Sequence, residues 1–308
     1  MNHDHHHSHA HVAHASTASV RERRLLIAFG LTLCTLFAEA VGGWLSGSLA
    51  LLADAGHMLV DALALLFAWL GARFARRPAD ARRSFGYARL EVLVGYTNAL
   101  AQFVLVGWIV FEAIGRFMAP GEILGGMMLA VALAGLLVNL LVLRVLHDHD
   151  EHDVNSASAR LHVLGDLLGS VGAVVAALLI RQFGWNWSDA LISVFVSLLI
   201  LGNAWQLLRR SGHILLEGAP SGVDMAIVAS TLEQAGIGVA GVHHVHVWEL
   251  AGGSAMATLH ARLDAGVEAD AAIASVQRVL REHFGVIHAT VQIEAGDCAS
   301  APCPEHRH

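Results

Sequence analysis

Six apolar runs, each close to the ~20 residues that cross a bilayer as an α-helix, restrict this chain more than any other feature of its sequence. They fall at roughly 25–45, 49–72, 92–117, 123–146, 161–181 and 187–208 of the 308 residues. The chain is 55% hydrophobic and 15% charged, which is typical of a membrane protein that also carries one small soluble domain. The first run lacks the cleavage pattern of a signal peptide, so the sequence predicts six transmembrane helices.

The arginine residues predict the orientation of these helices, because the chain contains no lysine. Arginines gather before the first run, in the second and fourth connections, and after the sixth run: Arg21, Arg23, Arg24, Arg73, Arg76, Arg77, Arg82, Arg83, Arg89, Arg144, Arg160, Arg209 and Arg210. The opposite connections hold only Arg116 and Arg181. Arginine-rich connections stay in the cytoplasm, so both termini are expected there. The arginine clusters fit a topological signal rather than a nucleic-acid patch, and we expect no nucleic-acid partner.

Two His-x-x-x-Asp steps lie inside two of the apolar runs, His57 with Asp61 and His162 with Asp166. Residues four apart share one face of an α-helix, so each step presents an imidazole and a carboxylate together. Two such helices supply two nitrogens and two oxygens, a tetrahedral set for a zinc-like ion. One such pair could be a structural hydrogen bond, but two identical pairs at membrane depth predict a metal transport site.

Three other classes of protein are weighed against a transporter. A membrane metalloprotease would need an H-E-x-x-H motif, which the sequence lacks, so we expect no enzyme. A non-transporting metal sensor has no need of His and Asp pairs within the membrane. A passive channel would be expected to use weaker ligands spread over several sites.

Other polar residues within the apolar runs have two possible roles, in the ion path or between helices. For Gln102 and Asn139 we expect hydrogen bonds between helices. Glu39, Asp54 and Asp189 could have either role.

After Arg210 the sequence takes the pattern of a small soluble domain. Helical periodicity covers 223–235 and 268–284, and alternating, β-rich segments cover 242–250, 255–263 and 286–294. The order αββαβ predicts an α+β fold of ferredoxin-like type, with its helices on one face of the sheet. The expected domains are a His-rich N-terminal tail (1–20), a transmembrane domain (21–212), a cytoplasmic domain (213–297) and a Cys/His tail (298–308).

Three histidines of the soluble domain form a second candidate metal site. His244 and His260 lie on the two arms of the predicted hairpin, and His288 is near the start of the last strand. Strands of one sheet could bring the three within metal-binding distance. Regular alternation places His246 on the face of His244 and His243 on the other face.

Histidine is also concentrated outside these sites. Seven of the 21 histidines lie in the first 14 residues, and three alternate with acidic residues in 147–153. Such tracts bind Zn²⁺, Ni²⁺ or Cu²⁺ weakly and exchangeably. The alternatives to metal binding are an expression tag for the first tract and a solvated linker for either tract. The tail holds Cys298, Cys303, His306 and His308, which could supply a further ligand.

Several motifs resemble those of the cation diffusion facilitator family, and in particular its bacterial zinc/cadmium exporters. They are ADAGHMLVD at 53–61, SFGYARLE at 84–91, LHVLGDLLGS at 161–170 and LLEGAP at 215–220. The resemblance runs from about residue 20 to 295. It implies that His57, Asp61, His162 and Asp166 form the transport site.

The resemblance also implies a proton-coupled homodimer in the bacterial inner (plasma) membrane. Zn²⁺, and Cd²⁺ with it, would be the transported substrate, with efflux of Co²⁺ or Ni²⁺ as the alternative, and Zn²⁺ is also a possible regulatory ligand. Arg89 and Glu217 match the family's charge interlock. His244, His260 and His288 match three cytoplasmic ligands, whereas Ile273 and Thr290 stand where two-metal members have ligands. The resemblance therefore favours a single cytoplasmic zinc.

A proton-coupled exchange follows from the chemistry of the four transport ligands. Zn²⁺ binds neutral imidazoles and ionised carboxylates, and two carboxylates leave the loaded site without a large net charge. Imidazole titrates near pH 6.5, so protons compete with the metal near physiological pH. The sequence thus predicts that protons displace zinc and return as the counter-ion.

Overall fold

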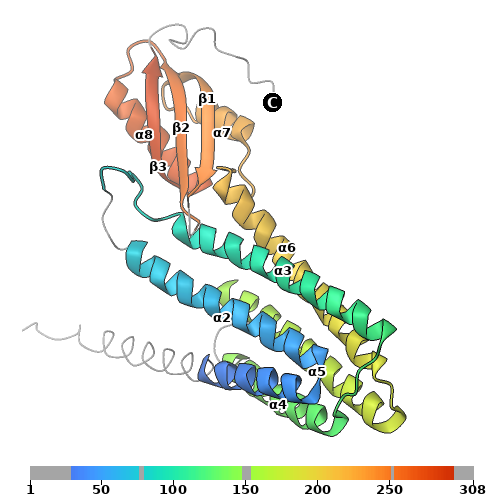
Figure 1. Ribbon diagram of the computed structural model, residues 1–308. Coiled ribbons are helices and arrows are strands. Elements are labelled where there is room, and N and C mark those ends of the chain that lie inside the picture. Colours follow the sequence, from blue (N-terminus) through green and yellow to red (C-terminus); the bar gives the residue numbers. More distant parts are fainter. Residues whose placement is uncertain (1–28, 76–79, 148–153, 251–252, 295–308) are drawn as a thin grey trace, which may run out of the picture. The chain divides into compact units, whose positions relative to one another are not determined.

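A computed structural model describes residues 29–75, 80–147, 154–250 and 253–294 (Figure 1). Within these residues, six helices are long and apolar enough to cross a membrane, as the sequence predicts. They are Phe29–Ser46, α2 (Leu49–Ala75), α3 (Leu90–Met118), α4 (Gly125–His147), α5 (Val154–Phe183) and α6 (Trp187–Leu215). The chain is therefore a multi-pass membrane protein.

The described residues form two compact units. One consists of the residues up to Phe67 together with Thr97–Gln206, and the other of Ala68–Tyr96 together with the residues from Leu207 onward. Helices α2, α3 and α6 thus contribute to both units. The first unit holds the candidate transport site, and the second holds the C-terminal domain.

Small residues let the helices of the first unit pack closely. Ala173, Ala176 and Ala177 of α5 are buried in one apolar cluster with Leu51 and Met128. At Gly42 of the first span, a Cβ atom would clash with the side chain of Val131 on α4, so only glycine permits this approach. Large apolar side chains such as Phe37, Trp44, Val104 and Phe111 remain exposed, as expected of surfaces that face lipid.

Asp189 joins three helices of this unit at the beginning of α2. Its carboxylate accepts hydrogen bonds from Ser48 Oγ (2.7 Å) and from the backbone N–H groups of Leu49 (2.7 Å) and Ala50 (3.2 Å). It is fully buried and lies 3.8 Å from the Arg116 guanidinium of α3. Since N–H groups at a helix start lack partners within the helix, Asp189 caps α2 from α6. Of the two roles weighed for it, the structure shows hydrogen bonding between helices.

Asp189→Asn is expected to destabilise the protein by about 1–3 kcal/mol without changing its zinc affinity, because one amide oxygen cannot replace two charged acceptors. Thermal unfolding of the purified protein in detergent measures the effect. Ser197→Ala is the matched control on the same helix, since the Ser197 hydroxyl donates to the Ser193 carbonyl oxygen within α6. An unchanged unfolding temperature in Asp189→Asn would contradict the capping role.

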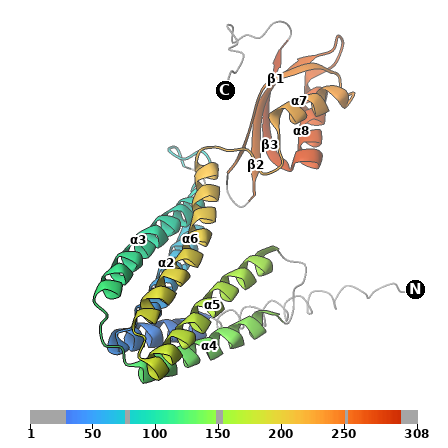
Figure 2. The same ribbon diagram turned by 90° about the vertical axis from the view of Figure 1, so that its right-hand side faces the viewer.

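The C-terminal domain has the predicted αββαβ order. It comprises α7 (Met225–Gln234), β1 (Val239–Glu249), β2 (Ala255–Leu263), α8 (Ala269–Phe284) and β3 (Val286–Glu294). The strands form one sheet in the order β1-β2-β3, with β2 antiparallel to β1 and parallel to β3. Both helices lie on the same face of this sheet (Figure 2), which confirms the predicted fold class.

The core of this domain lies between the helices and the sheet. Val228 and Leu232 of α7 and Val276 and Leu280 of α8 are completely buried against alternate residues of the strands, such as Leu259. The side chain of Asp224 accepts the Ala226 N–H and begins α7, and Gly285, with φ of 65°, ends α8 in the left-handed region. Because the core takes one set of alternate positions, the other set points to the face without helices.

Candidate metal centres

Three of the four predicted transport ligands converge in the first unit. His57 of α2 is buried, with 7% of its surface exposed. Its Nε2 atom lies 3.7 Å from Oδ2 of Asp61 and 3.6 Å from Oδ1 of Asp166 on α5. Ligand atoms that share a tetrahedral zinc ion are about 3.3 Å apart, so these atoms are close to the spacing of a metal shell.

His162, the fourth predicted ligand, lies one helical turn before Asp166 on α5. Its side chain lies outside the part of the chain that the structure describes. The helical spacing places it on the same face of α5 as Asp166.

Two amides of α3 orient these ligands. Gln102 Nε2 donates to Asp61 Oδ1 at 2.7 Å, and Gln102 Oε1 lies 3.1 Å from Nδ1 of His57. Asn98 Nδ2 also donates to Asp61 Oδ1, at 3.2 Å. Both polar atoms of the Gln102 amide face Nδ1 of His57, Nε2 at 2.8 Å and Oε1 at 3.1 Å. Gln102 therefore holds one ring nitrogen of His57, and the other, Nε2, is the one that faces the carboxylates of Asp61 and Asp166.

For Gln102 the sequence predicts a hydrogen bond between helices, but not a contact with metal ligands. The bond does join α2 and α3, but its partners are two metal-ligand candidates. The available signal was spacing: Asn98 and Gln102 are four residues apart and present two amides on one face of α3. Nothing in the sequence shows that this face meets His57.

A second cluster lies on the face of the C-terminal sheet that carries no helix. His243 Nε2 is 2.9 Å from Oε2 of Glu294, and His260 Nδ1 is 2.9 Å from Oε1 of the same carboxylate. One ligand atom from each of the three residues lies within 4.8 Å of the others. Glu294 is buried, with 6% of its surface exposed. Two imidazoles and a carboxylate form a ligand set suited to zinc.

The structure places the three predicted cytoplasmic ligands differently. The ring of His244 stacks on that of His260, with centroids 4.8 Å apart. His288 is exposed and pairs in register with Met256, whereas His260 pairs with Gln292. The four residues from His288 to Gln292 span about 13 Å of strand, so within one chain His288 does not reach the cluster.

A β-bulge brings His243 into the cluster. The register of β1 shifts between His243 and His246, and His244 adopts a φ of 51°. His243 pairs directly with His260, and paired residues of neighbouring strands share a face. The expectation that His243 points away from the others is therefore wrong, since it assumed uninterrupted alternation.

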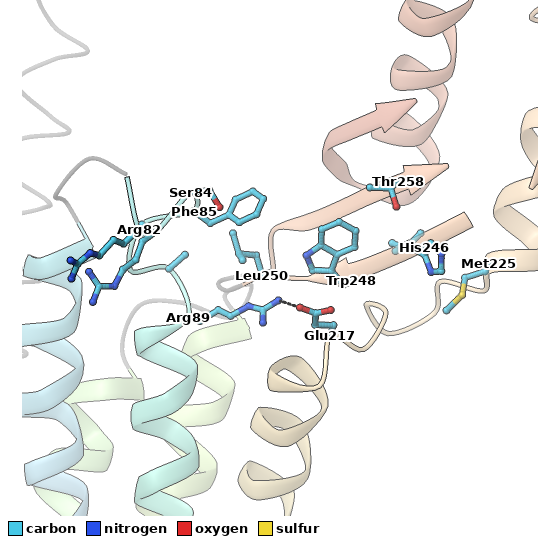
Figure 3. Close-up of a pocket in the computed structure, with 14 residues that line it drawn as sticks. Arg82, Ser84, Phe85, Arg89, Glu217, Met225, His246, Trp248, Leu250 and Thr258 are labelled. Atoms are coloured by element: carbon cyan, nitrogen blue, oxygen red, sulfur yellow. Dashed lines mark hydrogen bonds and ion pairs between the residues drawn. The ribbon is translucent and has the colours of Figure 1, made fainter. Parts of the chain in front are cut away.

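Arg89 at the start of α3 pairs with Glu217, which follows α6, at 3.1 Å (Figure 3). Both are predicted interlock residues, and both lie in the second unit. Their side chains are 35% and 66% exposed, so the pair contributes about 1 kcal/mol or less. They border a cavity of about 620 Å³, whose lining also includes Phe85, Met225, His246 and Trp248. Glu217 has a φ of 62°, which is unusual for a residue other than glycine.

Comparisons with known proteins show which family both parts of the chain resemble. Residues 25–216 match the family domain described as "Cation efflux transmembrane domain", and residues 220–296 match "Cation efflux protein, cytoplasmic domain". The zinc transporter ZitB of Escherichia coli is 48% identical over 282 residues, which cover 91% of this chain and 90% of ZitB.

More distant relatives carry other metals in their names. The metal cation efflux system protein CzcD of Cupriavidus metallidurans is 40% identical, covering 92% of this chain and 90% of CzcD. A cadmium, cobalt and zinc/H(+)-K(+) antiporter of Bacillus subtilis is 36% identical, covering 92% of both chains. The solved metal-bound C-terminal domain of the CzcD transporter is 32% identical, with a TM-score of 0.22, and covers 23% of this chain and 99% of that domain. With a family domain matched over most of its length, and with long relatives at up to 48% identity, the chain belongs to the cation efflux, or cation diffusion facilitator, family of transporters.

Proposed function

We propose that this protein exports Zn²⁺, and Cd²⁺ with it, from the cytoplasm in exchange for protons. The observation that carries the proposal is the position of His57 Nε2, which lies between the carboxylates of Asp61 and Asp166 inside membrane-spanning helices. His162 completes the ligand set. The names of the relatives, which include zinc transporters and an antiporter of cadmium, cobalt, zinc and H⁺, support the same function. These relatives are transporters and not enzymes.

The ligand set accounts for both the selectivity and the exchange. Two imidazoles make the site softer than one built from carboxylates alone, which favours Zn²⁺ and Cd²⁺ over Mn²⁺. The ionised Asp61 and Asp166 balance the +2 charge of the ion, so the occupied site carries little net charge at membrane depth. Metal and protons compete for the same nitrogen and oxygen atoms, so protons that enter the outward-facing site release the metal.

The protein acts as a homodimer in the bacterial inner membrane, with both termini in the cytoplasm. The arginine-rich connections support this orientation, and so does the match of residues 220–296 to a cytoplasmic domain. The name of that family domain, ZT_dimer, supports dimerisation. The His-rich segments 1–20 and 147–153 would then lie on the side from which zinc is collected.

Zinc at the C-terminal cluster regulates the transporter. His243, His260 and Glu294 converge on one point of the sheet, and His244 stacks against His260 beside it. A ligand shifts a conformational equilibrium only through different affinities for the two states, so zinc would favour the arrangement in which this cluster is complete. Arg89 and Glu217 link α3 to the chain that leads into the domain, which suits the predicted interlock.

Uptake of zinc into everted membrane vesicles tests the function. With an acidic interior, vesicles that contain the protein are expected to accumulate zinc against its gradient, and collapse of the pH gradient should stop the accumulation. A channel would equilibrate zinc with or without the gradient, and a sensor would transport none. The same assay with Cd²⁺, Co²⁺ and Ni²⁺ as competitors identifies the preferred metal.

A further inference from the structure

An apolar cluster of three helices closes one side of the candidate transport site. Its members are completely or almost completely buried: Leu49 and Ala53 of α2, Ile109 and Ala113 of α3, and Ala190 of α6. Ala53 precedes His57 by one helical turn, so the cluster begins about 6 Å from this ligand along α2. The far end of α2 leads to an arginine-rich connection, so in the proposed orientation the cluster lies on the outer side of the site.

The exposure of the ligands increases in the opposite direction. The side chain of His57 is 9% exposed, and that of Asp61, one turn closer to the cytoplasmic end of α2, is 21% exposed. On the outer side, Ala53 is completely buried. The site is thus accessible from the cytoplasmic side and closed on the outer side. An exporter has to reverse this arrangement to release its ion, because transporters open a fixed site to the two sides in turn.

The side chain of Arg116 clamps the outer edge of this cluster, one turn after Ala113 on α3. Its Nη1 atom donates to the carbonyl oxygen of Gly47, in the connection before α2, and lies 3.8 Å from Oδ2 of Asp189 on α6. Its Nε atom donates to Oε1 of Glu112, on α3 itself, at 3.1 Å. Arg116 therefore joins the outer turns of α3 both to the beginning of α2 and to α6.

The contacts of Arg116 are easier to break than those of Asp189. The Arg116 side chain is 26% exposed, so water can replace its partners, whereas the buried Asp189 holds the beginning of α2 through three hydrogen bonds. Three residues of the cluster are alanines, whose separation exposes little apolar surface. Further inward, Val106 of α3 is packed with Val196 and Ile200 of α6. The outer turns of α3 can therefore leave α2 while the inner part of α3 keeps its contacts.

We propose that Arg116 and the apolar cluster form the outer gate of this transporter, and that the Arg116 guanidinium leaves Gly47 and Asp189 when zinc is released outward. This inference rests on the proposed export of zinc. Loss of the two contacts frees the outer turns of α3 from α2, so the cluster can part on the outer side of His57. Arg116 is a positioning residue, since it acts by holding α3 and does so outside the ligand set.

The accessibility of position 53 from outside tests the clamp. Ala53→Cys is introduced into a full-length protein whose three native cysteines are replaced by serine, and intact cells are treated with a membrane-impermeant thiol reagent. Arg116→Gln is expected to raise the rate of labelling by about 10-fold, because loss of the charged contacts shifts the equilibrium toward the outward-open state. Arg116→Lys, which keeps the charge without the planar array of N–H groups, should give an intermediate rate. Arg181→Gln, at an exposed arginine near the outer end of α5, is the matched control and should leave the rate unchanged.

A reversible cross-link across the cluster tests the gate itself. In the same background, Leu49→Cys with Ala113→Cys is linked by a bis-thiosulfonate reagent, and Ala53→Cys with Ile109→Cys serves as an independent pair should the first fail to fold. Each link should stop zinc transport in proteoliposomes, and a reducing agent should restore it. Calorimetry should show that the linked protein still binds zinc, because the ligands stay open to the cytoplasmic side. Linking Val106→Cys with Ile200→Cys, where α3 and α6 stay together, should leave transport unchanged.

Three outcomes would overturn the proposal. Labelling at the unmodified rate in both Arg116→Gln and Arg116→Lys would show that Arg116 does not hold the gate closed. Normal transport with either outer pair fully linked would show that the cluster need not part. Equal loss of transport with the Val106 and Ile200 pair linked would show that any link between the helices blocks transport. Absence of zinc transport in the unmodified protein would instead contradict the proposed function itself.

Discussion

Zinc transport is expected to fall by more than about 100-fold when Asp166 is replaced by alanine, and equally when Asp61 is replaced. Each change removes a negative charge and an oxygen ligand from a site in which His57 Nε2 lies within 3.7 Å of both carboxylates. The remaining ligands can neither complete a tetrahedral shell nor balance the charge of the ion at membrane depth. Initial rates of zinc uptake in proteoliposomes measure the loss, with gel filtration to confirm that the variants are folded.

Gln102→Ala is the informative comparison for this experiment. Gln102 touches the ligands His57 and Asp61 rather than the metal, so its removal should weaken zinc binding by about 10- to 100-fold without abolishing transport at high zinc concentration. Asp80→Ala, at an exposed carboxylate outside the transport site, should behave like the unmodified protein. Transport at the normal rate by Asp61→Ala or Asp166→Ala would show that these carboxylates do not form the transport site.

The second large effect concerns zinc binding by the C-terminal domain. In a protein that carries Asp61→Ala and Asp166→Ala, Glu294→Gln or His260→Ala should each weaken the tightest remaining zinc binding by more than about 100-fold. Glu294 contacts both histidines at 2.9 Å, so its loss breaks both halves of the cluster. Calorimetric titration of the full-length protein measures the change, and all variants keep the His-rich segments so that only the cluster differs.

His288→Ala distinguishes the two candidate ligand sets of this domain. The set predicted from sequence includes His288, whereas the structure gathers His243, His260 and Glu294. If the structural set binds zinc, His288→Ala should change the affinity little, and His243→Ala should weaken it strongly. The reverse pattern would show that the predicted set binds zinc, with His288 brought in from elsewhere in the assembly.

The six membrane-spanning helices and the αββαβ order of the C-terminal domain follow from the sequence because both depend on local periodicity. A run of about 20 apolar residues can satisfy its backbone in a bilayer only as a helix, whatever its neighbours are. Strand β2 and strand β3 begin and end where the alternation predicts, at Ala255–Leu263 and Val286–Glu294. The His-x-x-x-Asp steps are local too, since the pitch of one helix sets the relation of His57 to Asp61.

The meeting of separate helices depends on tertiary structure. The approach of Gln102 to His57 depends on how α3 is rotated against α2. The two residues are 45 positions apart, and no local pattern in the sequence encodes that rotation. Asp189 caps a helix that begins 140 residues earlier, a contact with no counterpart in local periodicity.

The C-terminal cluster shows the same division within a single sheet. The sequence by itself determined which segments become strands and that histidines would gather on them. Only the tertiary structure decided which histidines meet, because one extra residue at His244 moves His243 to the face of His260, and the parallel pairing of β3 places Glu294 beside them. A bulge moves a side chain to the other face of a sheet, and a change of strand register moves it by several ångströms along the sheet. Both are determined by long-range hydrogen bonding and packing.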